Sequence, residues 1–116
     1  MAGSASRVVF AIYAEGLEND VAFVTDGQLS GLCLKGLTVA EVSPEAATGG
    51  PIGKVRDGDT IRISVANRSI DIAVPLEEMA ARDGVGYVTE ASGYLANFRE
   101  TVRPLDTGGV LLPPSC

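Results

Sequence analysis

Hydrophobic and polar residues alternate most regularly between positions 60 and 74. In each of the runs 60–65 and 69–74, every second residue is isoleucine or valine. A period of two places these side chains on one face of a half-buried strand, and the polar segment 66–68 between the runs reverses the chain. The pattern predicts an antiparallel hairpin. Its inward face carries Ile61, Ile63, Ile70 and Ile72, with Val65 continuing the face of the first run.

Shorter apolar stretches predict three further elements in the first third of the chain. The almost continuous apolar run 8–15 fits either a helix that ends at Gly16, since glycine suits the position after a helix, or a buried strand, and we favour the helix. The runs 21–25 and 38–42 are short and contain β-branched residues, which is typical of strands.

Start and stop signals indicate short helices in the rest of the chain. Ser43 can cap a helix over 43–48, because Pro44 suits the first helical position and Glu45 suits the positive end of the helix dipole. Two later segments carry strong helix formers or one apolar face, and the glycine- and proline-rich tail 104–116 is expected to be irregular. These two helical segments are 76–82 and 92–102.

Together these elements predict one α+β domain over residues 1–116. Its sheet is small, barrel-like and partly antiparallel, with short helices around it. The length of 116 residues fits a single domain, and 46% hydrophobic residues are enough to build a core. We expect residues 1–7 to be either disordered or a cloning remnant.

Charge and cysteine content narrow the function classes. The net charge of −6 argues against nucleic-acid binding, which needs a basic surface. No apolar run is long enough to span a membrane, and the N-terminus lacks a secretory signal, so a cytoplasmic protein is expected. Without histidine, and with only Cys33 and Cys116, the chain has too few ligands for a metal site. Both cysteines are interpreted as ordinary thiols.

Four short segments resemble, in order and spacing, the C-terminal domain of the dihydroxy-acid and phosphogluconate dehydratase family. They are Thr-Asp-Gly-Gln-Leu-Ser-Gly at 25–31, Val-Ser-Pro-Glu-Ala-Ala at 42–47, Gly-Gly-Pro-Ile at 49–52 and Val-Arg-Asp-Gly-Asp at 55–59. The interval between the serine-glycine pair and Val42, with Lys35 inside it, is more similar to the phosphogluconate branch. So is the segment 93–99.

The resemblance implies a swivelling β/β/α domain of a hydro-lyase that removes water from an anionic sugar acid such as 6-phosphogluconate. It implies an iron–sulfur cluster and Mg²⁺ in a larger N-terminal domain, which would be the partner of this one, and a homodimeric parent enzyme. No cofactor is expected on this chain itself, and the isolated chain is expected to be inactive.

The resemblance also implies roles for five residues of the loop that follows the 21–25 strand. Ser30 would take the proton from C2 of the substrate, although serine is a poor base unless its alkoxide is stabilised. Gly27 and Gly31 would let backbone N–H groups converge beside it. Asp26 would hold the turn, and Lys35 would meet a substrate anion.

Plainer interpretations stay open for each of these residues. The Asp-Gly pair at 26–27 fits an ordinary turn, Lys35 fits a solvated loop lysine, and the segment 56–59 fits a β-turn. Two residues depart from the family pattern, because Gln28 replaces an arginine and Glu41 replaces a histidine. These changes favour an alternative, a non-catalytic interaction or regulatory domain that kept the fold and lost the chemistry.

Overall fold

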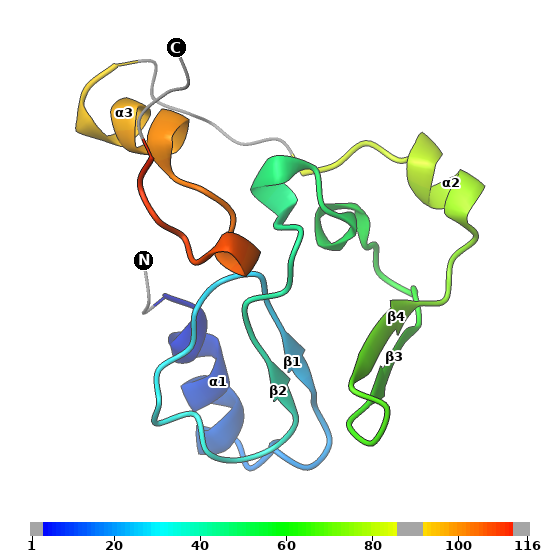
Figure 1. Cartoon of the computed structure of the whole chain (residues 1–116). Coiled ribbons are helices and arrows are strands. Elements are labelled where there is room, and N and C mark those ends of the chain that lie inside the picture. The colour runs from blue at the N-terminus through cyan, green and yellow to red at the C-terminus, as the bar shows by residue number, and fades with distance from the viewer. Residues whose placement is uncertain (1–3, 86–91, 113–116) are drawn as a thin grey trace.

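The computed structural model describes residues 4–85 and 92–112 and confirms the α+β class (Figure 1). Its strands form two separate two-stranded sheets, and these do not close into a barrel. The elements are α1 (Ser4–Ala14), β1 (Phe23–Val24), β2 (Thr38–Val39), the 3₁₀ turns η1 (Ala46–Thr48) and η2 (Pro51–Lys54), β3 (Ile61–Ser64), β4 (Ser69–Ile72), α2 (Leu76–Ala81), α3 (Tyr94–Thr101) and the 3₁₀ turn η3 (Leu105–Thr107).

The hairpin predicted from the alternating pattern is present. Strands β3 and β4 pair antiparallel, with Ile61 opposite Ile72 and Ile63 opposite Ile70, and all four isoleucines are half-buried. Val65 does not continue this face, because it lies beyond the end of β3 in the turn that reverses the chain. Its side chain is 75% exposed.

The N-terminal run forms a helix, which decides between the two interpretations of its apolar pattern. Helix α1 begins at Ser4, so residues 4–7, which we expected to lie outside the fold, form its first turn. Ser6 and Val9 are buried, and Gly16 follows the helix in the left-handed conformation. In Figure 1, α1 lies on one side of the parallel pair β1–β2, and the hairpin lies on the other side.

The helix predicted over 43–48 is wrong in extent and in its cap. Only the 3₁₀ turn η1 forms there, because the backbone of Glu45 is still extended at φ −67° and ψ 154°. Ser43 caps nothing. The first N–H of η1, that of Ala46, instead donates to Asp26 Oδ2 at 2.8 Å, so the cap comes from a loop twenty residues earlier.

A few specific contacts hold the last third of the chain. Arg82, at the end of α2, donates two hydrogen bonds to the Asp59 carboxylate and one to Glu78 Oε1. The Arg82 hydrogen bond, together with the Arg56 backbone N–H, lowers the pKa of Asp59 to about 2. The tail is more regular than expected, because it contains η3 and a bridge between Val102 and Leu111.

The apolar core of the described residues is small. Val9, Met79 and Ala96 are its buried members, while sixteen large apolar side chains are exposed. The chain exposes 8499 Å² to solvent, against about 6,000 Å² for a folded monomer of this mass. Within 4–85 and 92–112, no helix is long and apolar enough to cross a membrane.

Candidate functional site

The loop between β1 and β2 carries all five residues singled out from the sequence, and helix α1 holds it at two points. The Ser30 N–H donates to the buried Ser6 Oγ at 2.7 Å. The Tyr13 hydroxyl donates to the Lys35 carbonyl oxygen at 2.7 Å and accepts the Lys35 N–H at 2.8 Å. The backbone of this loop is therefore fixed by side chains from α1 rather than by the loop alone.

Ser30 lies in this loop after β1, as expected, and is half-buried. Its Oγ accepts the Leu32 N–H at 3.2 Å, and its carbonyl oxygen accepts the Cys33 N–H at 3.0 Å. One backbone donor therefore points at the hydroxyl oxygen, which would stabilise negative charge there. The hydroxyl proton is free to be directed to a ligand, since Oγ itself donates to no described residue.

Asp26 and Gly27 join the loop to the segment that follows β2. Besides the Asp26 cap on η1, the Glu41 N–H donates to the Gly27 carbonyl oxygen at 3.2 Å. The Gly27 N–H donates to Thr25 Oγ1 at 3.0 Å. Both residues therefore have structural partners here, and the carboxylate of Asp26 is committed to a backbone N–H.

The two glycines do not gather several N–H groups around Ser30. Neither Gly27 nor Gly31 has a positive φ angle, and the Gly27 N–H is already bonded within its own turn. A Cβ atom added to Gly31 would meet nothing within 4 Å, so the loop is open to solvent or to a ligand at that position.

The Lys35 ammonium group lies near Tyr13 of α1 and near Glu18, which follows that helix. Its Nζ lies 3.8 Å from Glu18 Oε1 and 5.8 Å from the centre of the Tyr13 ring, and its side chain is 64% exposed. An exposed ion pair of this kind contributes little to stability. It does place a carboxylate next to the lysine that was expected to meet a substrate anion.

The residues that depart from the family pattern border the same loop. Gln28 and Glu41 are both exposed, and Glu41 has a left-handed backbone at φ 56°. Glu45 has a different use, because its Oε1 accepts the Leu105 N–H at 2.6 Å and fastens the start of η3. Its Oε2 is buried and has no hydrogen-bond partner within 4–85 and 92–112.

The residues present do not fit an iron–sulfur cluster or a Mg²⁺ ion. No three Asp, Glu or Cys side chains gather as metal ligands anywhere in the described ranges. Cys33 is a free, half-buried thiol, and Cys116 lies outside the described residues. A cluster needs several thiolates held together, so no step of the chemistry is routed through such a group on this chain.

Ser6 and Tyr13 were not identified from the sequence. Ser6 belongs to the segment 1–7, which was expected to be disordered or a cloning remnant, and Tyr13 was counted only as part of an apolar run. The sequence offered one signal for them. Both side chains carry a hydroxyl, and a hydroxyl that becomes buried needs a hydrogen-bond partner. That signal does not say which backbone group the hydroxyl meets.

Comparison with known proteins gives this loop a context. Residues 4–109 match the family model described as dihydroxy-acid/6-phosphogluconate dehydratase C-terminal. A dihydroxy-acid dehydratase of Pyrococcus furiosus is 48% identical over 103 residues, which cover 87% of this chain and 18% of that protein. The dihydroxy-acid dehydratase of Pyrococcus abyssi is 47% identical over 102 residues, or 86% of this chain and 18% of that protein.

These relatives bear on two of the sequence predictions. The dehydratase family predicted from the motifs is confirmed. The phosphogluconate branch is not, because both relatives are dihydroxy-acid dehydratases. The chain spans less than a fifth of the length of these curated relatives.

Proposed function

The chain belongs to the dihydroxy-acid/6-phosphogluconate dehydratase C-terminal family, and from this premise we propose that it presents Ser30 to the substrate of a hydro-lyase. The supporting observation is the arrangement of the β1–β2 loop. Ser6 fixes the backbone of Ser30, and the Leu32 N–H is directed at its oxygen. A serine in this position is preorganised for a reaction at one atom.

The role of Ser30 is to accept the proton from C2 of a 2,3-dihydroxy acid as an alkoxide, after its own hydroxyl proton has passed to a base in the rest of such an enzyme. Loss of that proton and of the C3 hydroxyl as water leaves an enol, which becomes a 2-keto acid. The Leu32 N–H stabilises negative charge on Oγ before the proton arrives. The backbone next to Ser30 is open to a ligand at Gly31, where an added Cβ atom would meet nothing within 4 Å beyond its chain neighbours.

The substrate that fits this loop best has no phosphate group. Lys35, the cation expected to meet a phosphate, already faces the Glu18 carboxylate. The names of the two relatives point in the same direction, towards a dihydroxy acid.

The remaining chemistry belongs to polypeptide outside this chain. The described residues include no group of three or more side chains that could hold a metal ion, and the relatives are more than five times as long as the matched region. We assign the iron–sulfur cluster, Mg²⁺ and most substrate contacts to the rest of such an enzyme. The isolated chain is accordingly expected to be inactive, and a homodimeric, cytoplasmic parent stays a prediction.

The test is a full-length chimera in which this chain replaces the matched region of the Pyrococcus furiosus enzyme. We expect the chimera to dehydrate a 2,3-dihydroxy acid and Ser30→Ala to lower kcat at least a hundredfold. Ser69→Ala is the matched control, because Ser69 is exposed on β4 and its hydroxyl makes no hydrogen bond to a described residue. Equal rates for Ser30→Ala and Ser69→Ala would reject Ser30 as the base.

One observation favours a second candidate, a domain that kept the fold without the chemistry. The Glu41 backbone is bonded to Gly27, and its exposed carboxylate stands at the border of the loop, where it would repel an anionic substrate. If the chimera is inactive and Glu41→His restores dehydration, the charge at Glu41 accounts for the loss. That result would identify this chain as a non-catalytic relative.

A further inference from the structure

Three hydrogen bonds join the segment 41–46 to the first residues of the loop that carries Ser30. They run from the Val42 N–H to the Thr25 carbonyl oxygen at 3.2 Å, from the Glu41 N–H to the Gly27 carbonyl oxygen at 3.2 Å and from the Ala46 N–H to Asp26 Oδ2 at 2.8 Å. The three acceptors belong to consecutive residues, 25–27, which lead directly towards Ser30. The placement of the loop therefore depends on the placement of this segment.

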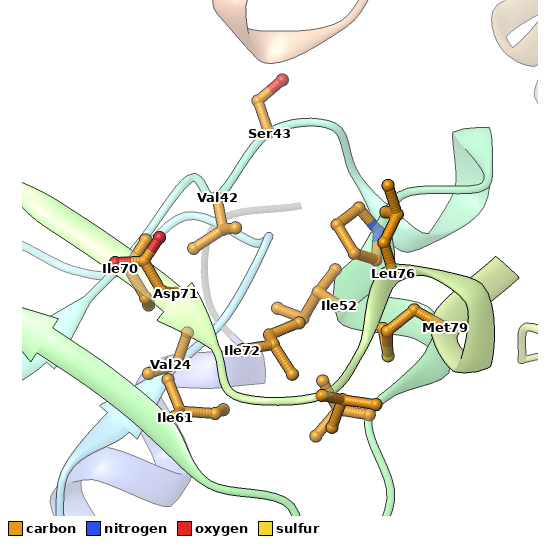
Figure 2. A pocket seen from close by; sticks show the side chains of 13 residues that line it. Val24, Val42, Ser43, Ile52, Ile61, Ile70, Asp71, Ile72, Leu76 and Met79 are labelled. Atoms are coloured by element: carbon orange, nitrogen blue, oxygen red, sulfur yellow. The ribbon is translucent and has the colours of Figure 1, made fainter.

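The segment 41–46 is also held by contacts away from the loop. Figure 2 shows Val42 pointing towards the other apolar side chains of a pocket of about 320 Å³. The Glu45 carbonyl oxygen accepts three hydrogen bonds, from the N–H groups of Thr48 and Gly50 and from Thr48 Oγ1. A Cβ atom added at Gly50 would clash with backbone carbonyl oxygens of this turn, so the turn closes tightly. The backbone from which the Glu45 side chain leaves is therefore fixed.

The Glu45 side chain joins this segment to the C-terminal part of the chain. Its Oε1 accepts the Leu105 N–H at 2.6 Å. Between the described ranges 4–85 and 92–112, this is the one hydrogen bond. Figure 1 shows η3, which begins at Leu105, beside the end of the β1–β2 pair from which the Ser30 loop leaves. Glu45 therefore connects the C-terminal part to the segment that supports the loop.

The carboxylate of Glu45 is retained at a cost to stability. Its Oε2 is buried and has no hydrogen-bond partner among the described residues. A buried polar atom without a partner is unfavourable, and one oxygen is enough to accept the Leu105 N–H. Locally unfavourable groups of this kind are typical of sites that serve function rather than stability.

We propose that Glu45 is a positioning residue for the reaction at Ser30. By holding η3 at Leu105, it keeps the segment 41–46 in place, and the Asp26 cap passes this placement to the loop. When the contact with Leu105 is lost, the segment is free to draw away from Asp26. A displacement of about 1 Å at a reacting group costs about a hundredfold in rate. The proposal rests on the proposed function, because it takes Ser30 as the reacting group.

Steady-state kinetics of the full-length chimera test this role. We expect Glu45→Ala to lower kcat at least tenfold and to change KM less than twofold, since it displaces the loop and not the rest of the substrate site. Glu45→Gln retains an oxygen for the Leu105 N–H, so its kcat should stay within threefold of that of the unchanged chimera. Glu77→Ala is the matched control, because Glu77 is exposed on α2 and its carboxylate makes no hydrogen bond to a described residue.

Two kinetic results would overturn the proposal. The first is an equal kcat for Glu45→Ala and Glu77→Ala, which would show that the contact has no effect on the reaction. The second is a Glu45→Gln variant as slow as Glu45→Ala, because the charge of Glu45 and not its contact with Leu105 would then be responsible.

The contact can also be removed from its other side. Leu105→Pro deletes the N–H, suits the first position of a helical turn and leaves Glu45 unchanged. It should lower kcat as Glu45→Ala does, and it keeps the proposal testable if Glu45→Ala does not fold. A Leu105→Pro chimera with an unchanged kcat would contradict the proposal.

A double-mutant cycle shows whether Glu45 acts through Asp26. If both residues act on Ser30 by one path, the chimera with Asp26→Ala and Glu45→Ala together should lose about as much kcat as the slower single variant. Independent effects multiply instead. A loss equal to the product of the two single losses would therefore refute the path through Asp26 and with it the proposal.

Amide hydrogen exchange in the chimera separates this proposal from the function of Ser30. Glu45→Ala should speed exchange at Leu105 and also at Ala46 at least fivefold, whereas the Ala73 amide, which is bonded to Thr60 in the hairpin, should change less than twofold. Faster exchange at Leu105 with unchanged exchange at Ala46 would disprove the link. An inactive chimera with faster exchange at both amides would support the link and count against Ser30 as the base, and an active chimera that Glu45→Ala does not slow would refute the role of Glu45 alone.

Discussion

Replacing Ser6 by alanine removes the only described acceptor of the Ser30 N–H without touching Ser30 itself. The Ser6 side chain is 3% exposed, and its Oγ lies 2.7 Å from the Ser30 nitrogen. The substitution deletes one oxygen atom and leaves the helix-forming tendency of α1 intact, because alanine is the best helix former. The change therefore isolates one hydrogen bond between α1 and the β1–β2 loop.

The size of the effect follows from the burial of the two groups. A buried donor that loses its partner costs about 1–3 kcal/mol. Ser30 is half-buried, so water can replace part of the lost bond, and we expect about 1–2 kcal/mol. A change of that size corresponds to a factor of about 5–30 in a two-state equilibrium.

Two measurements check this prediction on the chain. The Ser30 amide should exchange about 5- to 30-fold faster in Ser6→Ala, and the urea midpoint should fall, while Ser69→Ala leaves both unchanged. In the chimera, Ser6→Ala should lower kcat and leave KM nearly constant, since it loosens Ser30 and not the rest of the substrate site. An unaltered exchange rate at Ser30 would show that the Ser6 hydroxyl does not hold the loop.

Three further predictions concern charge, close packing and the cap on η1. Arg82 lowers the pKa of Asp59 from 3.8 to about 2, so the carboxylate stabilises the fold fully above pH 4 and loses this effect as the pH falls towards 2. The free energy of unfolding, measured from pH 5 to pH 2, should therefore decline less in Asp59→Asn than in the unchanged chain. Gly50→Ala should lower the free energy of unfolding in urea by about 1–3 kcal/mol, since the added Cβ would clash with the backbone carbonyl oxygen of Pro44, whereas Gly31→Ala should leave stability unchanged. Asp26→Ala should lower the free energy of unfolding in urea by about 1 kcal/mol, and Asp26→Asn should lower it less, because the asparagine oxygen can still accept the η1 N–H. An equal decrease for both variants would contradict the cap.

The hairpin and α1 show what a local pattern can predict. The alternation of isoleucines at 61, 63, 70 and 72 identified both strands and their inward face, and the antiparallel register agrees with it. Helix α1 was favoured from its apolar run, and Gly16 was correctly placed at its end. These features depend on side chains two to four residues apart, so the sequence contains their physical cause.

The segment 43–48 shows where local signals mislead. Serine, proline and glutamate in that order are typical of a helix start, yet the backbone stays extended through Glu45. The glutamate is used for a contact sixty residues away, since Oε1 binds the Leu105 N–H, and the cap comes from Asp26. Tertiary partners overrode the local preference, which is worth only about 1 kcal/mol.

The sequence by itself determined the α+β class, the family, the hairpin and the loop that carries Ser30, because each depends on short-range periodicity or on contiguous motifs. Only the tertiary structure decided that Ser6 supports Ser30 from twenty-four residues away and that Lys35 is paired with Glu18. It also decided that the two sheets leave an apolar pocket between them. The physical reason is that these contacts join segments that lie far apart in the sequence. Local patterns do not tell which distant segments meet, because only the packing of the folded chain brings them together.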